Sequence, residues 1–270
     1  MAPGRWLEGL GRLFTTLSRT PGAAKLSLGE SSLVAWVKLY RPDENTANSA
    51  VSYYLKGELV ALALDLALRR AGHALDEVLR QLFARHERGG VPEDGVERLV
   101  AELLGEAPAR EFFDRYVRGV APLEPDLGLV GLALCHRPAR AHDDKGGRPA
   151  KAEEGTPGWL GAELSSGPRL TVTSVREGSP AWQAGLSLDD ELLAEGGFRL
   201  DRTALAERLK ERGPAGTLRL TLFRRDELLE VAVPLAAPPA DTAWLEPVAE
   251  PSEAQRAAFR AWCGAPWPTP

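Results

Sequence analysis

The chain has 270 residues, with 33 lysine or arginine against 38 aspartate or glutamate, and a formal net charge of −5 at pH 7. It has no basic block of the kind that binds nucleic-acid phosphates, so we do not expect nucleic acid as a partner. The apolar share of 44% supports ordinary hydrophobic cores, and the length predicts about two domains. No apolar run approaches the roughly 18 residues of a membrane-spanning helix, so no membrane span is expected.

The N-terminal segment predicts an amphipathic helix near residues 5–19. It lacks the continuous apolar run of a signal peptide. The compartment stays open between cytoplasm and periplasm, because an export signal can precede Met1 if Met1 is not the true start. The apolar side chains recur every three or four residues: Trp6, Leu7, Leu10, Leu13, Phe14 and Leu17.

Residues 5–119 have a helical pattern almost throughout, with turns rich in glycine, proline and aspartate between the periodic segments. The third predicted helix is apolar on most sides between Leu59 and Leu68, which is typical of a helix buried in the middle of a bundle. Residues 129–134 fit either a short strand or the closing turn of this part. Six helices are predicted, near residues 5–19, 28–40, 52–71, 74–87, 93–104 and 108–118.

A domain boundary is predicted at residues 137–157, which are dense in proline, glycine and charge and offer no apolar face. We predict a mobile linker there, preceded by a helical domain over residues 1–136. His136 and His142 lie at its edge. They are expected to be solvated histidines, because no cysteine or carboxylate stands nearby at a metal-ligand spacing.

After the linker, the pattern changes to that of strands. One helix interrupts them, with Asp201 as its N-cap and Gly213-Pro214 as its stop. Residues 158–236 are predicted to form one small β-sandwich or partly open barrel, and residues 237–270 a C-terminal tail with a short helix. Five short strands are predicted, at residues 158–164, 170–175, 191–194, 217–223 and 228–233.

Four segments of this second part resemble those of a PDZ domain: Trp159-Leu160-Gly161-Ala162, Gly178-Ser179-Pro180-Ala181, Ala184-Gly185-Leu186 and Asp189-Asp190-Glu191-Leu192-Leu193. The resemblance implies recognition of peptides or polypeptide C-termini by β-strand addition. In that mode an extended peptide pairs with an open sheet edge, and backbone N–H groups of a loop receive its carboxylate. A glycine such as Gly161 suits the loop, because amides approach an anion closely where no side chain intervenes.

The same resemblance assigns the residues of the peptide groove. The carboxylate loop falls on Trp159, Leu160, Gly161 and Ala162, and the pairing strand on residues 162–164. The opposite wall is the helix after Asp201, where three residues would face the peptide at helical spacing. An alternative stays open, in which this helix packs on the core, its arginine is solvated and the chain itself fills the groove. The three helical residues are Arg202, Ala206 and Leu209.

The two parts together resemble the C-terminal portion of the glycyl aminopeptidase-like zinc metallopeptidases, a thermolysin-like gluzincin family with a C-terminal PDZ domain. The resemblance implies an α+β multidomain chain, with an all-α helical bundle followed by the PDZ-like barrel. The segments that carry it are Ser31-Ser32-Leu33-Val34-Ala35-Trp36, Tyr40-Arg41-Pro42-Asp43-Glu44-Asn45, Ser52-Tyr53-Tyr54-Leu55-Lys56-Gly57, Leu64-Asp65-Leu66-Ala67-Leu68-Arg69 and the tail from Gln255 to Gly264.

The zinc-binding motif of that family is not encoded in this sequence. A gluzincin takes two histidines and its general base from one helical H-E-x-x-H. The only His-Glu pair here is His86-Glu87, and Gly90 stands where the second histidine is needed. Cys135 and Cys263 are far apart and are expected to be unpaired thiols. We therefore expect no cofactor in this chain, zinc being the cofactor of the intact family.

Tyr54 is the one catalytic residue that the resemblance implies. In related aminopeptidases the tyrosine of the Y-x-K-G segment points at the scissile carbonyl and stabilises the tetrahedral oxyanion. The residues alone leave a second interpretation open, in which Tyr53 and Tyr54 anchor the start of a buried helix. Further along that helix, Asp65 needs a partner because it lies in an apolar segment, and Arg69 four residues on is expected to provide it.

Two functions are compatible with these observations. The first is the helical and PDZ portion of a zinc aminopeptidase-like protein, inactive alone, whose partner is the missing N-terminal catalytic portion. The second is a non-catalytic PDZ module that binds polypeptide C-termini. Substrate preference and oligomeric state are not encoded in any recognisable pattern.

Overall fold

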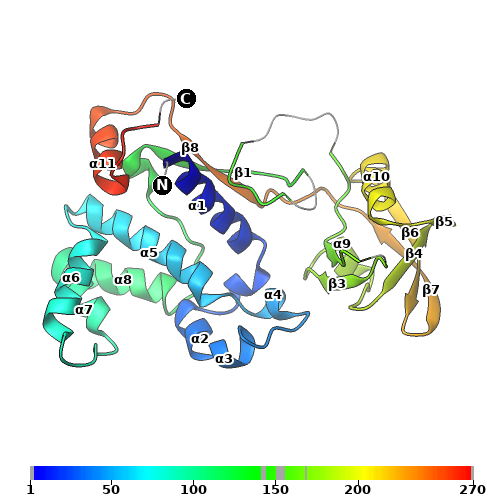
Figure 1. Cartoon of the computed structure of the whole chain (residues 1–270), viewed down its shortest axis with the longest axis horizontal. Coiled ribbons are helices and arrows are strands. Elements are labelled where there is room, and N and C mark those ends of the chain that lie inside the picture. Colours follow the sequence, from blue (N-terminus) through cyan, green and yellow to red (C-terminus); the bar gives the residue numbers. More distant parts are fainter. Residues whose placement is uncertain (1–2, 141–143, 150–155, 168, 269–270) are drawn as a thin grey trace.

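The computed structural model describes residues 3–140, 144–149, 156–167 and 169–268. Within them the chain is α+β, with helices and strands in two parts that lie side by side along the longest axis of the molecule (Figure 1). The helices are α1 (Pro3–Ser18), η1 (Pro21–Ala24), α2 (Leu28–Leu33), α3 (Ala35–Lys38), α4 (Thr46–Ser49), α5 (Tyr53–Arg70), α6 (Leu75–His86), α7 (Gly95–Leu104), α8 (Glu106–Tyr116), η2 (Leu127–Val130), α9 (Pro180–Gln183), α10 (Arg202–Arg212) and α11 (Glu253–Cys263).

Eight strands complete the described structure. They form three sheets, with the orders β1-β8, β2-β3 and β5-β4-β6-β7. None of these sheets, in the described residues, closes into a barrel. The α+β class expected from the sequence is confirmed, whereas the partly open barrel is not. The strands are β1 (Leu132–Arg137), β2 (Ala162–Leu164), β3 (Val172–Val175), β4 (Glu191–Glu195), β5 (Phe198–Arg199), β6 (Thr217–Arg224), β7 (Glu227–Pro234) and β8 (Thr242–Pro247).

Helix α5 is the centre of the helical part, as its apolar residues on most sides predict. Ser52 caps its N-terminus by accepting a hydrogen bond from the Leu55 N–H, which is the role that serine prefers at this position. One side of α5 packs with α1, η2 and α11, and its C-terminal half packs with α6, α7 and α8. The predicted ion pair is confirmed, because Arg69 Nε lies 2.8 Å from Asp65 Oδ2.

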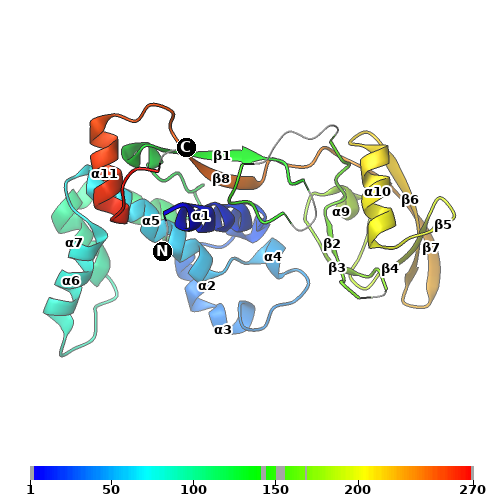
Figure 2. The same cartoon turned by 45° about the horizontal axis from the view of Figure 1, so that its top comes forward.

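The helical part is not all-α, because it contains a two-stranded ribbon. Strand β1 pairs antiparallel with β8, from Leu132 opposite Pro247 to Arg137 opposite Thr242. Helix α1 packs along β8 (Figure 2). Beyond the ribbon, α11 buries Phe259 in the same core as α1 and α5. Residues of the predicted C-terminal tail therefore form part of the first hydrophobic core.

The second part has its own core between the four-stranded sheet, β2–β3 and the helices α9 and α10. Leucine alternates with threonine and arginine along β6, so that one face of the sheet is buried, as in Leu218, Leu220 and Leu222. Asp190 is fully buried and accepts two hydrogen bonds from Arg224, which holds the turn before β4 against β6.

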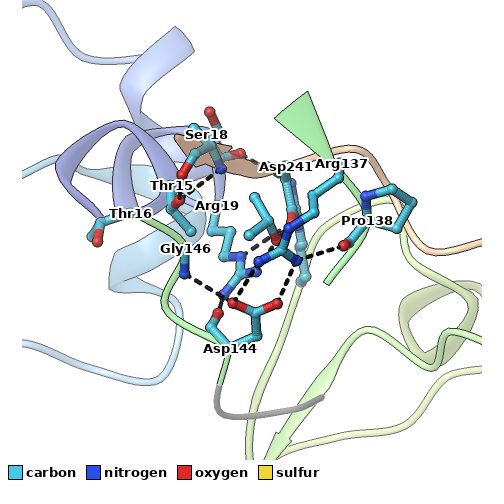
Figure 3. A network of polar contacts seen from close by, with 12 residues as sticks. Thr15, Thr16, Ser18, Arg19, Arg137, Pro138, Asp144, Gly146 and Asp241 are labelled. Atoms are coloured by element: carbon cyan, nitrogen blue, oxygen red, sulfur yellow. Dashed lines mark hydrogen bonds and ion pairs between the residues drawn. The ribbon is translucent and has the colours of Figure 1, made fainter. Parts of the chain in front are cut away.

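A polar network joins the two parts (Figure 3). The Asp241 carboxylate accepts a hydrogen bond from Arg19 Nε of α1 at 3.1 Å and one from Arg176 Nη1 of the second part at 2.6 Å. Arg176 Nη2 also donates to the Ser18 carbonyl. Asn48 adds a second connection, because its side chain donates to the Val175 carbonyl and accepts from the Glu177 N–H.

The same network holds part of the segment predicted as a linker. Asp144 forms an ion pair with Arg137 and accepts the Gly146 N–H, while Arg19 Nη1 donates to the Asp144 carbonyl. Burial opposes ionisation of Asp144, but the hydrogen bond from Arg137 and those from backbone N–H groups lower its pKa to about 2. Gly147 N–H donates to the Ala243 carbonyl of β8. Residues 144–149 are thus fixed on α1 and the ribbon.

Gly57 offers a test of the packing around α5. A glycine inside a helix costs about 1 kcal/mol relative to alanine, and a Cβ at Gly57 would lie 3.6 Å from Leu28 Cδ1, an ordinary contact. Gly57→Ala is therefore expected to raise the free energy of unfolding by about 1 kcal/mol in urea denaturation followed by circular dichroism. Gly22→Ala is the control, and it is expected to lower the free energy of unfolding, because its Cβ would lie 2.2 Å from the Ala50 carbonyl oxygen. A loss of stability in Gly57→Ala would contradict this packing.

Candidate functional site

The most chemically distinctive surface lies where α5 begins. Helix α5 starts at Tyr53, directly after the Ser52 cap, and the preceding loop returns Tyr40 to the same place. The Tyr40 hydroxyl lies 3.0 Å from the Tyr54 hydroxyl and 3.2 Å from that of Tyr53. The rings of Tyr53 and Tyr54 contact each other, with their centroids 4.0 Å apart and their planes tilted by 32°. Three phenols therefore share one hydrogen-bonded cluster.

The cluster makes the hydroxyls of Tyr53 and Tyr54 unequal. Hydrogen bonds from Tyr40 and then from Tyr53 lower the pKa of Tyr54 below its usual value of about 10. The hydrogen bonds of Tyr53 to Tyr40 and Tyr54 raise the pKa of Tyr53. Of Tyr53 and Tyr54, Tyr54 is thus the phenol whose oxygen better carries negative charge. A phenol of lowered pKa is also the better hydrogen-bond donor to a developing anion.

Removal of the Tyr40 hydroxyl should show directly that Tyr40 lowers the pKa of Tyr54. In Tyr40→Phe the phenolate of Tyr54 loses its first donor, so its pKa is expected to rise toward the ordinary value of about 10. The chain has four tyrosines, so ¹³Cζ-tyrosine labelling and a pH titration by NMR resolve them. Tyr116→Phe, in α8, is the control and should leave the pKa of Tyr54 unchanged. An unchanged pKa in Tyr40→Phe would contradict the cluster.

The helices α2 and α3, just before Tyr40, expose further apolar side chains, one of which contacts the cluster. We call the set Leu33, Trp36, Val37, Tyr40 and Tyr54 the tyrosine face. Leu33 is 84% exposed, Trp36 79%, Val37 71% and Tyr54 61%. The Trp36 ring lies 4.9 Å from the Tyr40 ring. Contiguous exposed apolar side chains of this kind mark interaction or ligand-binding surfaces in soluble proteins.

Lys56, two residues after Tyr54, has a structural role. Its side chain is buried and its Nζ donates to the carbonyls of Ala23 and Leu26 at 3.1 and 3.0 Å. Burial lowers its pKa, and nearby Glu30 opposes that shift. The lysine thereby fixes the turn after η1 against α5 and holds the base of the tyrosine face.

A cavity of about 340 Å³ lies beside the tyrosine face, between the two parts of the chain. The helical part supplies Lys38, Asp43 and Ser52 to its wall, and β3 supplies Thr173 and Ser174. Asp43 also shapes the loop, because its carboxylate accepts hydrogen bonds from the Asn45 N–H and the Thr46 hydroxyl. The Asp43 carboxylate thus has a structural role in this turn.

The described residues contain no group of three or more histidine, cysteine, aspartate or glutamate side chains that could hold a metal ion. His86 ends α6, and the residue four positions on is Gly90. Cys135 and Cys263 are free cysteines. His142 lies outside the described residues. The described residues therefore offer no set of donors for a zinc ion.

The residues expected to form a peptide groove lie at β2 and α10. Ala162 begins β2 and Arg202 begins α10. Leu160 is buried in the core of the second part, and Leu209 packs against that core, so their side chains have structural roles. Ala206 is exposed on α10. Trp159 pairs through its backbone with Ala236.

Gly161 is required by the packing as well as by its conformation. It has a φ of 77°, in the left-handed region that favours glycine. A Cβ there would lie 2.2 Å from the Ser179 Cβ, and Ser179 Oγ donates to the Gly161 carbonyl. A side chain at this position would therefore displace α9 from the loop that begins β2.

Comparisons with known proteins support a peptidase-like chain. The family model of the M61 glycyl aminopeptidases matches residues 1–60, which include all three tyrosines of the cluster. The chain is similar to the crystal structure of an aminopeptidase N family protein from Idiomarina loihiensis, with a TM-score of 0.85 and 28% identity over 97% of this chain and 44% of that one. The chain thus spans less than half the length of that protein.

Two further similarities are much weaker and carry no argument. The HtrA-type protease AlgW with decapeptide has a TM-score of 0.29 and 17% identity over 31% of this chain and 30% of that chain. The serine endoprotease from Yersinia pestis has a TM-score of 0.28 and 20% identity over 30% of this chain and 29% of that one. No curated protein matches the chain.

Among the described residues, no helix has the length and apolar character needed to cross a bilayer.

Proposed function

We propose that this chain is the helical and PDZ-like portion of a zinc aminopeptidase-like protein, in which Tyr54 stabilises the oxyanion formed during peptide-bond hydrolysis. The observation that carries the proposal is the exposed Tyr54 phenol, held by Tyr40 at 3.0 Å and lowered in pKa, within the segment that matches the M61 family. The exposed apolar side chains around it fit a surface made to be covered by a substrate-binding partner domain.

The role of Tyr54 follows from its chemistry. When a nucleophile attacks a peptide carbonyl, negative charge develops on the oxygen, and a donor already fixed at that place lowers the barrier. The hydrogen bond to Tyr40 and the contact with the Tyr53 ring fix the phenol, so little ordering is needed during the reaction. The zinc ligands and the general base belong to residues outside the described part of this chain, so this portion is expected to be inactive alone.

The proposal is tested by genetic context and by activity. Translation of the DNA upstream of Met1 is expected to give an open frame with H-E-x-x-H and a downstream glutamate. The polypeptide that includes that frame should release the N-terminal residue from peptide amides, and Tyr54→Phe should slow it. A stop codon directly upstream, with a ribosome-binding site before Met1, would contradict the proposal.

A second candidate function is the binding of polypeptide C-termini by residues 158–236, as a PDZ-like module. It is favoured by the short strand β2, which pairs only with β3 in the described structure, and by the glycine-containing loop before it. An extended peptide can add to such an edge. Its test is a comparison of one peptide with a free carboxylate and with a carboxamide end. Equal affinity for the two forms would exclude carboxylate recognition.

A further inference from the structure

Strand β2 pairs with β3 along one edge, and its other edge faces α10. Arg176 N–H donates to the Gly161 carbonyl at 2.9 Å, and Glu163 is opposite Ser174. In an antiparallel pair, neighbouring residues direct their backbone groups alternately to the partner strand and away from it. Gly161 and Glu163 thus face β3, and the backbone groups of Ala162 and Leu164 face the other edge.

Arg202 occupies part of this second edge. Its Nη2 donates to the Leu164 carbonyl at 2.8 Å and also to the Ser165 carbonyl. Arg202 is the first residue of α10, whose N-terminus is fixed because the Asp201 side chain accepts the Ala204 N–H at 2.8 Å. The guanidinium therefore bridges α10 and the end of β2.

A peptide in this groove would meet Arg202 at a defined residue. If the loop at residues 159–162 receives the terminal carboxylate, the peptide must run antiparallel to β2, so that its C-terminus points toward that loop. Its last residue then lies beside Ala162, and the third residue from its end lies beside Leu164, because alternate residues pair across an antiparallel ladder. The Leu164 carbonyl that this third residue needs is held by Arg202.

We propose that Arg202 limits the groove to the last two residues of a polypeptide C-terminus and so sets its specificity for ligand length. The proposal rests on the second candidate function. A longer peptide gains its next backbone hydrogen bonds only by displacing the guanidinium, so its further residues add little affinity. Removal of the guanidinium frees the Leu164 carbonyl and lets the strand addition continue.

The test compares two peptides with the same C-terminal sequence, acetyl-Ala-Leu and an acetylated hexapeptide that ends in Ala-Leu. Each peptide is prepared with a free C-terminal carboxylate and with a C-terminal carboxamide. Their Kd values for the whole chain are measured by ¹H–¹⁵N chemical-shift titration. The variants are Arg202→Ala, Arg202→Met, which keeps an apolar stem without the donors, and Lys210→Ala as the control. Lys210 carries the same charge near the other end of α10.

The wild-type chain and Lys210→Ala are expected to bind both carboxylate peptides with Kd values within about threefold. Both Arg202 variants should bind the hexapeptide about tenfold more tightly and the dipeptide unchanged. The wild-type chain could instead bind the hexapeptide tenfold more tightly than the dipeptide, with both Kd values unchanged in the Arg202 variants. That result would overturn the role of Arg202 but would leave peptide binding in the groove intact. If no protein distinguishes carboxylate from carboxamide, the candidate function itself fails.

Discussion

In the proposed polypeptide that joins this chain to zinc-binding residues, Tyr54→Phe is expected to lower kcat about 10²- to 10³-fold with little change in KM. The phenol interacts with charge that exists only in the transition state, so its loss raises the barrier rather than weakening substrate binding. The ring itself remains, and with it the contact with the Tyr53 ring. Steady-state hydrolysis of an amino-acid anilide gives both constants.

Tyr53→Phe is the matched control for this result. Tyr53 shares the same cluster, but its hydroxyl is bonded to Tyr40 at 3.2 Å and its pKa is raised, so it is a poor donor to an anion. Its removal is expected to change kcat less than about tenfold. A Tyr54→Phe enzyme with the kcat of wild type, or equal losses in both variants, would contradict the assignment of Tyr54.

Asp241→Asn is expected to lower the free energy of unfolding by about 2–3 kcal/mol. The Asp241 side chain is only 10% exposed and is paired with both Arg19 and Arg176. The amide leaves these two guanidinium groups without their anion, and breaking a buried ion pair from one side costs more than the pair contributes. Because both arginines are about one quarter exposed, water reduces that cost. Guanidinium chloride denaturation measures the change.

Glu211→Gln provides the surface comparison. Glu211 pairs with Arg208 at 2.7 Å, but its side chain is 60% exposed. Exposed pairs contribute little, so this variant should stay within about 0.5 kcal/mol of the wild-type chain. An equally small change in Asp241→Asn would show that the network in Figure 3 does not hold the two parts together.

Periodicity predicted most of the helical part, and α5 shows why. Its apolar residues on most sides indicate burial, and the serine and arginines at its ends mark its limits, so the predicted helix at residues 52–71 matches Tyr53–Arg70 within a residue at each end. The sequence pattern did not decide whether residues 129–134 form a turn or a strand. The structure contains both, with η2 ending at Val130 and β1 starting at Leu132.

Strand β8 was not predicted from the sequence. It is six residues long and lies between proline-containing segments, so its local pattern resembles a tail. Its partner β1 is more than one hundred residues earlier, and the pairing depends on contacts with α1 that no local period encodes. The all-α description of the first part was wrong for that reason.

The candidate site was only partly accessible from the sequence. Tyr54 was indicated by resemblance, but its partner Tyr40 lies fourteen positions earlier, across the loop that contains α4. No spacing rule predicts such a contact between hydroxyls. Arg202 was expected to face a peptide or solvent, whereas its guanidinium binds the backbone carbonyls at the end of β2. Such contacts follow from the approach of two elements in space.

The central proposal, that this chain completes a peptidase site with Tyr54 but supplies no zinc ligands, is tested most directly by metal content and turnover measured together. Both are determined for the 270-residue chain and for the same chain extended by the reading frame upstream of Met1. We expect neither zinc nor aminopeptidase activity in the first, and one zinc with Tyr54-dependent turnover in the second. Stoichiometric zinc and turnover in the 270-residue chain would contradict the account.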